Sequence, residues 1–125
     1  MDTNRKGKLA ETKSIARFLE KGEIVLTPVT DERYDLVLDR GEHFIRVQCK
    51  MGHIKDGGVI EFNSSSVDRK SYRGDADYFS VYVPKINTLF MVPVGDVSES
   101  KGYLRLVPPA NNQKKDIRYM YKYIY

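Results

Sequence analysis

The sequence predicts an α/β or α+β fold in which an N-terminal helix packs on a mixed β-sheet. One stretch with helical periodicity opens the chain, and β-rich runs separated by short Gly-containing turns follow it. The 125 residues, of which 41% are hydrophobic and 30% charged, suit a single domain over residues 1–125 that buries its own core. We find no internal repeat or linker that would divide it.

The helix is predicted over residues 5–21, because apolar or small side chains recur there at three- and four-residue spacing. This stripe consists of Leu9, Thr12, Ile15, Ala16 and Leu19. Gly22 follows the last turn and is a typical residue at which a helix ends. We therefore expect this stripe to face the sheet.

The strands are predicted from β-rich runs bounded by turn residues. These runs cover residues 23–29, 34–39, 43–50, 59–63, 77–83, 88–94 and 103–107. The short turn at residues 40–42, which contains Gly41, favours an antiparallel hairpin between the second and third runs. Residues 64–75 are polar without periodicity and are predicted as a loop. From Ile117 the tail alternates, with tyrosines at 119, 121, 123 and 125, which indicates a strand or partner-facing edge, although a final helix also fits.

Composition and charge exclude several classes of protein. No apolar run approaches the roughly 20 residues that span a bilayer, and the polar residues 1–8 form no signal peptide, so we expect a cytoplasmic protein without a membrane anchor. Cys49 is the single cysteine, and with His43 and His53 it matches no zinc-ligand spacing. The net charge of +4 is concentrated at the ends, in residues 1–22 and 101–125. That pattern suits a protein that binds phosphate, but charged termini on any soluble protein also produce it.

One group of polar residues stands out because of where the predicted elements place it. Asp35 lies at the start of its strand, and on the next strand the two-residue period puts Gln48 and Lys50 on one face. Glu11 lies at the border of the helix stripe, about 40° from Ile15 at 100° per residue. Its carboxylate can therefore point toward the edge of the sheet while its neighbours pack.

Such a group suits metal-assisted hydrolysis of a phosphodiester. An aspartate offers the hard oxygen that Mg²⁺ prefers, and a bound metal lowers the pKa of its water. A nearby lysine can orient the attacking water or offset developing charge. Aspartates after turns and lysines at strand ends are also common without any such role, so the spacing by itself leaves both interpretations open.

The sequence resembles the PD-(D/E)xK nuclease superfamily, in which a helix glutamate precedes an aspartate and a strand that ends on lysine. More closely, it is similar to the branch of cyanobacterial group I intron-encoded homing endonucleases and related prophage and archaeal proteins. The segments that carry this resemblance are KGKLAE at 6–11, RYDLV at 33–37, RVQCK at 46–50, YRGDADYF at 72–79 and NNQKK at 111–115. They extend over nearly the whole chain.

The resemblance implies a restriction-endonuclease-like core and an Mg²⁺-dependent endonuclease acting on double-stranded DNA, with Mn²⁺ as a substitute and no nucleotide cofactor. Asp35 and the backbone carbonyl of Cys49 would ligate the metal, Glu11 and Gln48 would complete the site, and Lys50 would position the nucleophile. Glutamine is the usual residue of this branch where most of the superfamily has a carboxylate. We expect Gln48 to weaken metal affinity, because it removes one negative charge. Tyr34 stands where the superfamily name has proline, a frequent departure.

Basic and amide residues in two polar stretches are candidates for DNA contacts, although solvated loops without a partner explain them too. The candidates are Lys8, Arg69, Lys70 and Arg73, and then Asn111, Asn112, Gln113, Lys114 and Lys115. Asp75 and Asp77 are expected to pair with Arg73 or to cap the following strand rather than to bind metal. Cutting both strands of one site needs two active sites, so we expect a homodimer or homotetramer.

Two alternatives remain open from the sequence. A structure-specific nuclease such as an archaeal-type Holliday junction resolvase shares the glutamate, the aspartate and the lysine, but usually carries a carboxylate where Gln48 stands. A DNA-binding protein without catalysis belongs to another class, and the intact polar positions argue against it.

Overall fold

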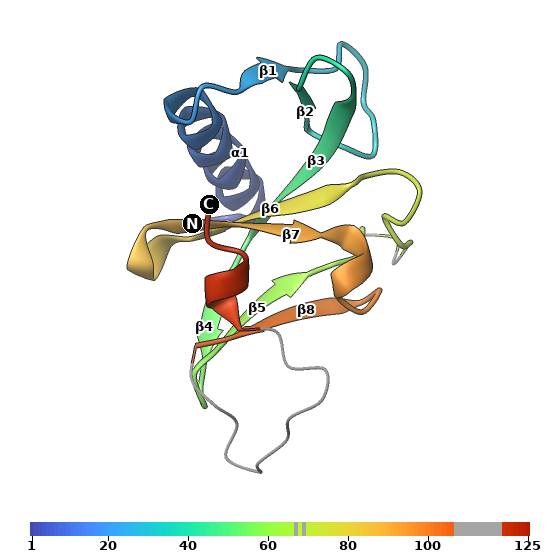
Figure 1. Cartoon of the computed structure of the whole chain (residues 1–125). Helices are drawn as coiled ribbons and strands as arrows, with labels where there is room; N and C mark the ends of the chain where they lie inside the picture. The colour runs from blue at the N-terminus through green and yellow to red at the C-terminus, as the bar shows by residue number, and fades with distance from the viewer. Residues whose placement is uncertain (67, 69, 107–118) are drawn as a thin grey trace.

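The computed structural model describes residues 1–66, 68, 70–106 and 119–125. Helix α1 lies on one side of a five-stranded sheet, and a three-stranded sheet lies on the other side (Figure 1). The predicted fold, an N-terminal helix packed on a mixed sheet, is confirmed. Its elements in chain order are α1 (Thr3–Glu20), β1 (Ile24–Leu26), β2 (Leu36–Asp39), β3 (Phe44–Met51), β4 (His53–Lys55), β5 (Val59–Asn63), β6 (Tyr78–Val83), η1 (Pro84–Ile86), β7 (Thr88–Pro93), η2 (Val94–Asp96), β8 (Lys101–Arg105) and η3 (Met120–Lys122).

The five-stranded sheet has the order β1-β2-β3-β6-β7 and is mixed. Its central pair, β3 and β6, is parallel, and the other neighbours are antiparallel. The predicted hairpin between the second and third runs is confirmed, with Leu36 opposite Val47. A parallel pair needs a crossover connection. Here the chain between β3 and β6 forms β4 and β5, which join β8 in the second sheet.

Helix α1 begins after Asp2, whose carboxylate accepts a hydrogen bond from the Arg5 N–H at 2.9 Å. Its buried face lies nearly opposite the predicted stripe: Ala10, Ser14 and Phe18 are fully buried, and at 100° per residue their mean direction is roughly 160° from that of the stripe. Leu9 and Ile15 are only partly buried, and Thr12, Ala16 and Leu19 are exposed. The stripe was therefore predicted on the wrong side of the helix. Ala10 and Ser14 are small and four residues apart, which lets the helix approach the sheet closely beside the buried Phe18 ring.

Two cores lie on opposite faces of the five-stranded sheet. The helix-side core is formed by Ala10, Phe18, Leu36, Leu38, Ile45, Val47, Cys49, Tyr82, Leu89 and Met91. The core between the two sheets is formed mainly by Ile60, Phe62, Tyr72, Phe79, Val81, Val83, Phe90, Val92 and Leu104. Strand β3 contributes Val47 and Cys49 to the helix side, so Gln48 and Lys50 project from its opposite face, as the two-residue period predicted.

Three details of the secondary structure differ from the prediction. Strand β4 was missed, because it is short and borders a glycine. Strand β8 begins at Lys101 rather than at residue 103. The described end of the tail, residues 119–125, forms η3 and two isolated bridges rather than a strand, because the Tyr123 N–H donates to the Met120 carbonyl and closes a turn.

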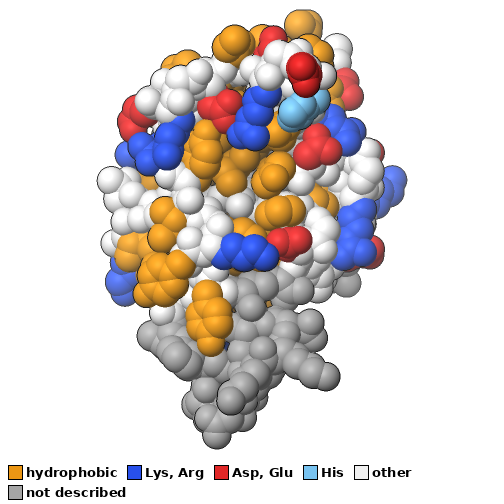
Figure 2. Space-filling model, in the orientation of Figure 1, with side chains coloured by type: hydrophobic (Ala, Val, Ile, Leu, Met, Phe, Trp, Pro, Cys, Tyr) orange, Lys and Arg blue, Asp and Glu red, His pale blue; other side chains and the backbone are white. Residues whose placement is uncertain are grey.

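Among the described residues, no helix is long and apolar enough to cross a membrane. On the face shown in Figure 2, basic and acidic side chains are interspersed with hydrophobic ones. This face is therefore not a continuous basic surface of the kind that electrostatic DNA binding favours.

Candidate active site

A cleft of about 590 Å³ lies between the first turns of α1 and the ends of β2 and β3. The predicted catalytic residues Glu11, Asp35, Gln48 and Lys50 all line it, together with Cys49. Lys8 lines it as well, and other lining residues include Lys6, His53, Asn63 and Tyr72. The structure thus brings residues from the helix, from the start of β2 and from β3 to one place.

Asp35 is fixed where β2 begins beside β3. Its backbone N–H donates to the Val47 carbonyl, and its carboxylate accepts a hydrogen bond from the Cys49 N–H, both at 2.8 Å. Burial raises the pKa of the Asp35 carboxyl, the bond from Cys49 opposes this, and the negative charge of Glu11 raises the pKa further. The ionised carboxylate therefore gains from a cation placed in the cleft.

The backbone of Cys49 faces the same space as Asp35. The N–H and the C=O of one strand residue point to the same side, so the Cys49 carbonyl is directed toward the edge where its N–H meets the aspartate. The thiol points into the helix-side core, and burial raises its pKa far above the ordinary value. Cys49 therefore offers its backbone, and not its sulfur, to the cleft.

Glu11 reaches the cleft from the third turn of α1, with its side chain 25% exposed. Its carboxylate lies 3.5 Å from the Lys8 ammonium, one turn earlier on the same helix. Gln48 is half-buried on β3, opposite Phe79 of β6. These two residues provide further oxygen atoms next to Asp35.

Lys50 projects from the face of β3 that is turned away from the helix-side core. Its ammonium donates to the Ser65 carbonyl and to the Tyr72 hydroxyl, both at 3.3 Å. Burial lowers the pKa of Lys50, the charge of Asp35 opposes this, and the charge of Arg33 lowers it further.

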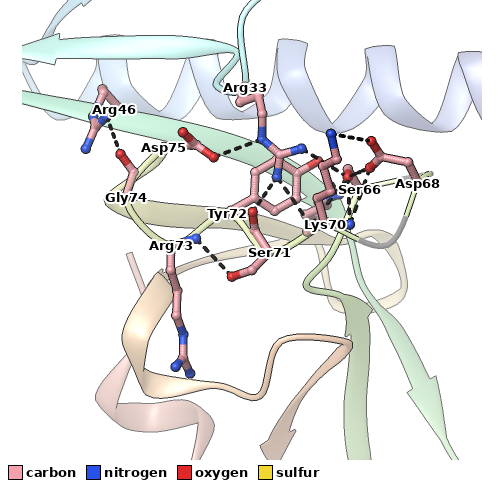
Figure 3. A network of polar contacts seen from close by, with 11 residues as sticks. Arg33, Arg46, Ser66, Asp68, Lys70, Ser71, Tyr72, Arg73, Gly74 and Asp75 are labelled. Atoms are coloured by element: carbon pink, nitrogen blue, oxygen red, sulfur yellow. Dashed lines mark hydrogen bonds and ion pairs between the residues drawn. The ribbon is translucent and has the colours of Figure 1, made fainter.

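The described members of the predicted DNA-contacting set, Lys8, Lys70 and Arg73, have separate surroundings. Lys70 is exposed and pairs with Asp68 at 3.7 Å, and the Arg73 side chain extends away from this pair (Figure 3). It reaches Glu99 at 3.5 Å and the Val97 carbonyl at 3.2 Å. Of this set, Lys8 lines the cleft. Arg69 and residues 111–115 lie outside the described residues.

The two aspartates of the 72–79 segment are engaged by arginines, but not by the one that was predicted. Asp75 pairs with Arg33 at 3.1 Å, and Asp77 binds Arg46 through both its side chain and its backbone N–H. Arg73 is turned toward Glu99 instead. Of the two predicted alternatives, pairing with Arg73 is therefore wrong, because sequence neighbours in this loop point in opposite directions. Asp77 directly precedes β6, and its carboxylate accepts the Arg46 N–H of the neighbouring strand β3.

Sequence reasoning missed Arg33 and Tyr72. Both belong to segments that carried the family resemblance, 33–37 and 72–79, and that position was the available signal. Their importance depends on contacts between residues far apart in the chain, with Tyr72 reaching Lys50 across 22 positions.

The cleft combines oxygen atoms with the ammonium groups of Lys6, Lys8 and Lys50, and the oxygen atoms decide what kind of metal could fit it. Among the described residues, no group of three or more His, Cys, Asp and Glu side chains could hold an ion. The carboxylates of Glu11 and Asp35, the Gln48 amide and the Cys49 carbonyl are oxygen atoms at the cleft that could hold an ion together. A set of hard oxygens with room for water fits Mg²⁺, which keeps several waters, and does not fit a closed zinc site.

These features define a restriction-endonuclease-like fold with a cleft where α1 meets the ends of β2 and β3. The chain belongs to the PD-(D/E)XK endonuclease family, whose model matches residues 1–125. Its structure is similar to that of the bacterial homing endonuclease I-Ssp6803I, with 25% sequence identity, a TM-score of 0.72, and coverage of 98% of this chain and 86% of that one.

A second solved structure shares the fold. It is Hjc from Archaeoglobus fulgidus, a Holliday junction resolvase, with 15% identity, a TM-score of 0.52, and coverage of 80% of this chain and 84% of that one. No curated protein matches the sequence.

Proposed function

We propose that this protein is a metal-dependent endonuclease that hydrolyses phosphodiester bonds of double-stranded DNA at specific sites, with Mg²⁺ as its cofactor and Mn²⁺ as a substitute. The observation that carries the proposal is the convergence of Glu11, Asp35, Gln48 and Lys50 on one cleft. Carboxylates, an amide and a lysine at one cleft are the residue types that metal-assisted hydrolysis needs. A shared role in catalysis explains their meeting at one place more simply than four separate structural roles do.

Asp35 and the Cys49 carbonyl are the proposed direct metal ligands, with Glu11 and Gln48 completing the site. A bound Mg²⁺ would lower the pKa of its water and stabilise negative charge on the phosphate. Asp35 is buried beside Glu11, and the negative charge of Glu11 adds to the cost of charging Asp35, a cost that a bound cation would offset. The Cys49 N–H fixes one oxygen of Asp35 at 2.8 Å and leaves the rotation of the carboxylate little freedom.

Lys50 is proposed to hold the attacking water and to offset charge at the reacting phosphate. Its ammonium is anchored by Ser65 and Tyr72 rather than by the carboxylate of Asp35. It can therefore donate toward the cleft without first breaking an ion pair. Positioning of this kind lowers the entropic cost of bringing water to the phosphorus.

Cleavage of a specific linear site is favoured over cleavage of a branched junction. Gln48 supports this choice, because the resolvase group usually has a carboxylate at that position, and the similarity to I-Ssp6803I extends over 98% of the chain. Competition between a linear duplex library and a four-way junction tests it. Preferential cleavage of the junction would reverse the choice.

The test of catalysis is nicking of supercoiled plasmid with Mg²⁺, with Mn²⁺ and with a chelator. We expect metal-dependent cleavage by the wild type, loss of cleavage in Lys50→Ala, and full activity in Lys85→Ala, a change at an exposed lysine of η1. Cleavage that survives Lys50→Ala would refute the assignment. DNA binding with no cleavage under any metal would support the non-catalytic alternative.

Gln48→Glu tests the metal site itself. A third carboxylate would raise the affinity for a divalent cation, so the Mg²⁺ concentration at half-maximal cleavage should fall. Gln48→Leu is the matched control, because it removes the amide oxygen without adding charge and should raise that concentration. Tighter use of metal by the wild type than by Gln48→Glu would contradict the role of Gln48.

Two active sites are needed to cut both strands, so we further propose a homodimer or homotetramer that acts in the cytoplasm. Sedimentation velocity with and without duplex DNA measures this state. A monomer that nonetheless makes double-strand breaks in a single encounter would contradict it.

A further inference from the structure

The ring of Tyr72 lies next to two cationic side chains. The Arg33 guanidinium carbon is 4.5 Å from the ring centroid, and the Lys50 ammonium is 4.7 Å from it. The same ammonium is 3.3 Å from the Tyr72 hydroxyl. Tyr72 is 6% exposed, so its ring is largely shielded from water, which strengthens cation–π attraction, whereas the Arg33 side chain is 31% exposed.

Arg33 is fixed by the loop that carries Tyr72, as Figure 3 shows. Its guanidinium donates to the Ser66 hydroxyl at 3.1 Å, to the Lys70 carbonyl at 3.2 Å and to the Ser71 carbonyl. Its Nε lies 3.1 Å from the Asp75 carboxylate, although the N–H is not aligned for a hydrogen bond. A guanidinium is suited to binding several acceptors of one loop at the same time, because its N–H donors lie in one rigid plane.

The core holds the remaining edge of the Tyr72 ring. Tyr72 packs edge-to-face on Phe79 with 5.7 Å between centroids, and Phe79 packs in the same way on Phe62 at 5.5 Å. The ring therefore has a fixed position between the core and Arg33. The Tyr72 hydroxyl is therefore held in one position beside the Lys50 ammonium, and no change of rotamer is needed for the contact.

We propose that Arg33 and Tyr72 form a clamp that positions the Lys50 ammonium for catalysis. The Tyr72 hydroxyl and the Ser65 carbonyl are the hydrogen-bond acceptors of Lys50 among the described residues. An ammonium has three N–H groups, so the clamp directs the third toward the cleft. Both are positioning residues, and this inference rests on the proposed role of Lys50 in hydrolysis.

The place of Arg33 in the chain gives the clamp a second effect. Arg33 precedes Asp35 by two residues, so the side chain that fixes Tyr72 also ties the strand start that carries Asp35 to the 65–75 loop. The lysine and the aspartate are thereby held in a fixed relation across the cleft. Loss of the clamp should impair the chemical step more than the binding of DNA.

The first experiment compares Tyr72→Phe with Tyr103→Phe, a change at an exposed tyrosine of β8. Tyr72→Phe keeps the ring and removes only the hydroxyl. We expect kcat to fall about tenfold or more with KM within a factor of two, because the bond that is lost involves a charged group. Tyr103→Phe should behave as the wild type. An unchanged kcat in Tyr72→Phe would overturn the proposal.

The second experiment observes Lys50 directly and does not depend on cleavage. Protein labelled with ¹⁵N-lysine should show a slowly exchanging Nζ signal from Lys50, identified by its absence in Lys50→Ala. We expect this signal to broaden or vanish in Tyr72→Phe and in Arg33→Lys, which retains the charge but not the planar set of donors. A signal unchanged in both variants would refute the clamp.

The two readouts separate this inference from the proposed function. If the wild type cleaves no DNA but the Lys50 signal responds to Tyr72→Phe, the clamp stands and the catalytic assignment fails. If Lys50→Ala abolishes cleavage while Tyr72→Phe changes neither kcat nor the signal, the assignment stands and the clamp fails. If Tyr72→Phe does not fold, the signal in Arg33→Lys decides.

Discussion

Gly102 in β8 lies directly opposite Phe62 of β5, where the backbone of one strand touches an aromatic ring of the other. A Cβ at position 102 would lie 2.2 Å from Cζ and 2.4 Å from Cε1 of Phe62. Non-bonded carbons rest at about 3.5–4.0 Å. The change Gly102→Ala therefore forces the ring or the strand to move by about 1 Å or more.

The size of the penalty follows from the surroundings of Phe62. The residue is 1% exposed and its ring packs edge-to-face on Phe79, so it cannot turn toward water. Overpacking of a well-filled core costs about 1–3 kcal/mol. We expect about 2–3 kcal/mol here, at the upper end, because the conflict involves three ring atoms and a strand backbone.

Urea denaturation followed by circular dichroism measures the free energy of unfolding. Gly95→Ala is the matched control, since a Cβ at that position meets no atom within 4 Å. Gly95→Ala should be neutral or slightly stabilising, because it lowers the entropy of the unfolded chain. Gly102→Ala should shift the midpoint to a clearly lower urea concentration.

A double-mutant cycle isolates the steric cause. Phe62→Leu removes the ring atoms that conflict with a Cβ at position 102, so the double variant should be more stable than the sum of the single changes predicts. We expect a favourable coupling of about 1 kcal/mol or more. A Gly102→Ala variant as stable as Gly95→Ala, or a coupling of zero, would show that the reasoning is wrong.

Two further predictions concern buried and paired polar groups. Ser14→Ala removes a hydroxyl that bonds to the Ser80 hydroxyl at 2.7 Å in the helix-side core, and should lower the free energy of unfolding in urea by about 1–2 kcal/mol. The control Ser100→Ala, at an exposed serine, should have no measurable effect, and equal effects of the two changes would contradict the prediction. In Asp77, burial raises the pKa but the hydrogen bonds from Arg46 outweigh this and lower it. The contribution of Asp77 to stability should therefore be present above about pH 3.8 and be lost as the pH falls below it. The difference in the free energy of unfolding between the wild type and Asp77→Asn should shrink in acid, and a difference independent of pH would argue against this prediction.

Local patterns predicted much of this fold because they depend on neighbours in the chain. The single helix, the hairpin of β2 and β3, and the alternation that puts Gln48 and Lys50 on one face all follow from periodicity and one turn. The buried face of the helix was predicted on nearly the opposite side, because Leu9, Ile15 and Leu19 are more apolar than Ala10 and Ser14. Burial follows the geometry of approach to the sheet, and Ser14 is buried because Ser80 lies opposite it.

The candidate site was only partly accessible from the sequence. Residues such as Asp35 and Lys50 were identified through their spacing and the family resemblance, and the structure places them in one cleft. The partners that fix them could not be predicted. A period of two says on which face Lys50 lies, but not that the loop at Tyr72 folds back to meet it.

The sequence by itself determined the order of the elements, the family and the residue types available for chemistry, because each depends on local preference or on segments that can be compared along the chain. Tertiary structure decided which groups meet: the Cys49 N–H with Asp35, and Tyr72 with Lys50 and Arg33. The physical reason is that these contacts form when separate strands and a loop close around two cores. Charge and burial at the cleft exist only after that closure, and they are what distinguishes an ordinary aspartate and lysine from a candidate active site.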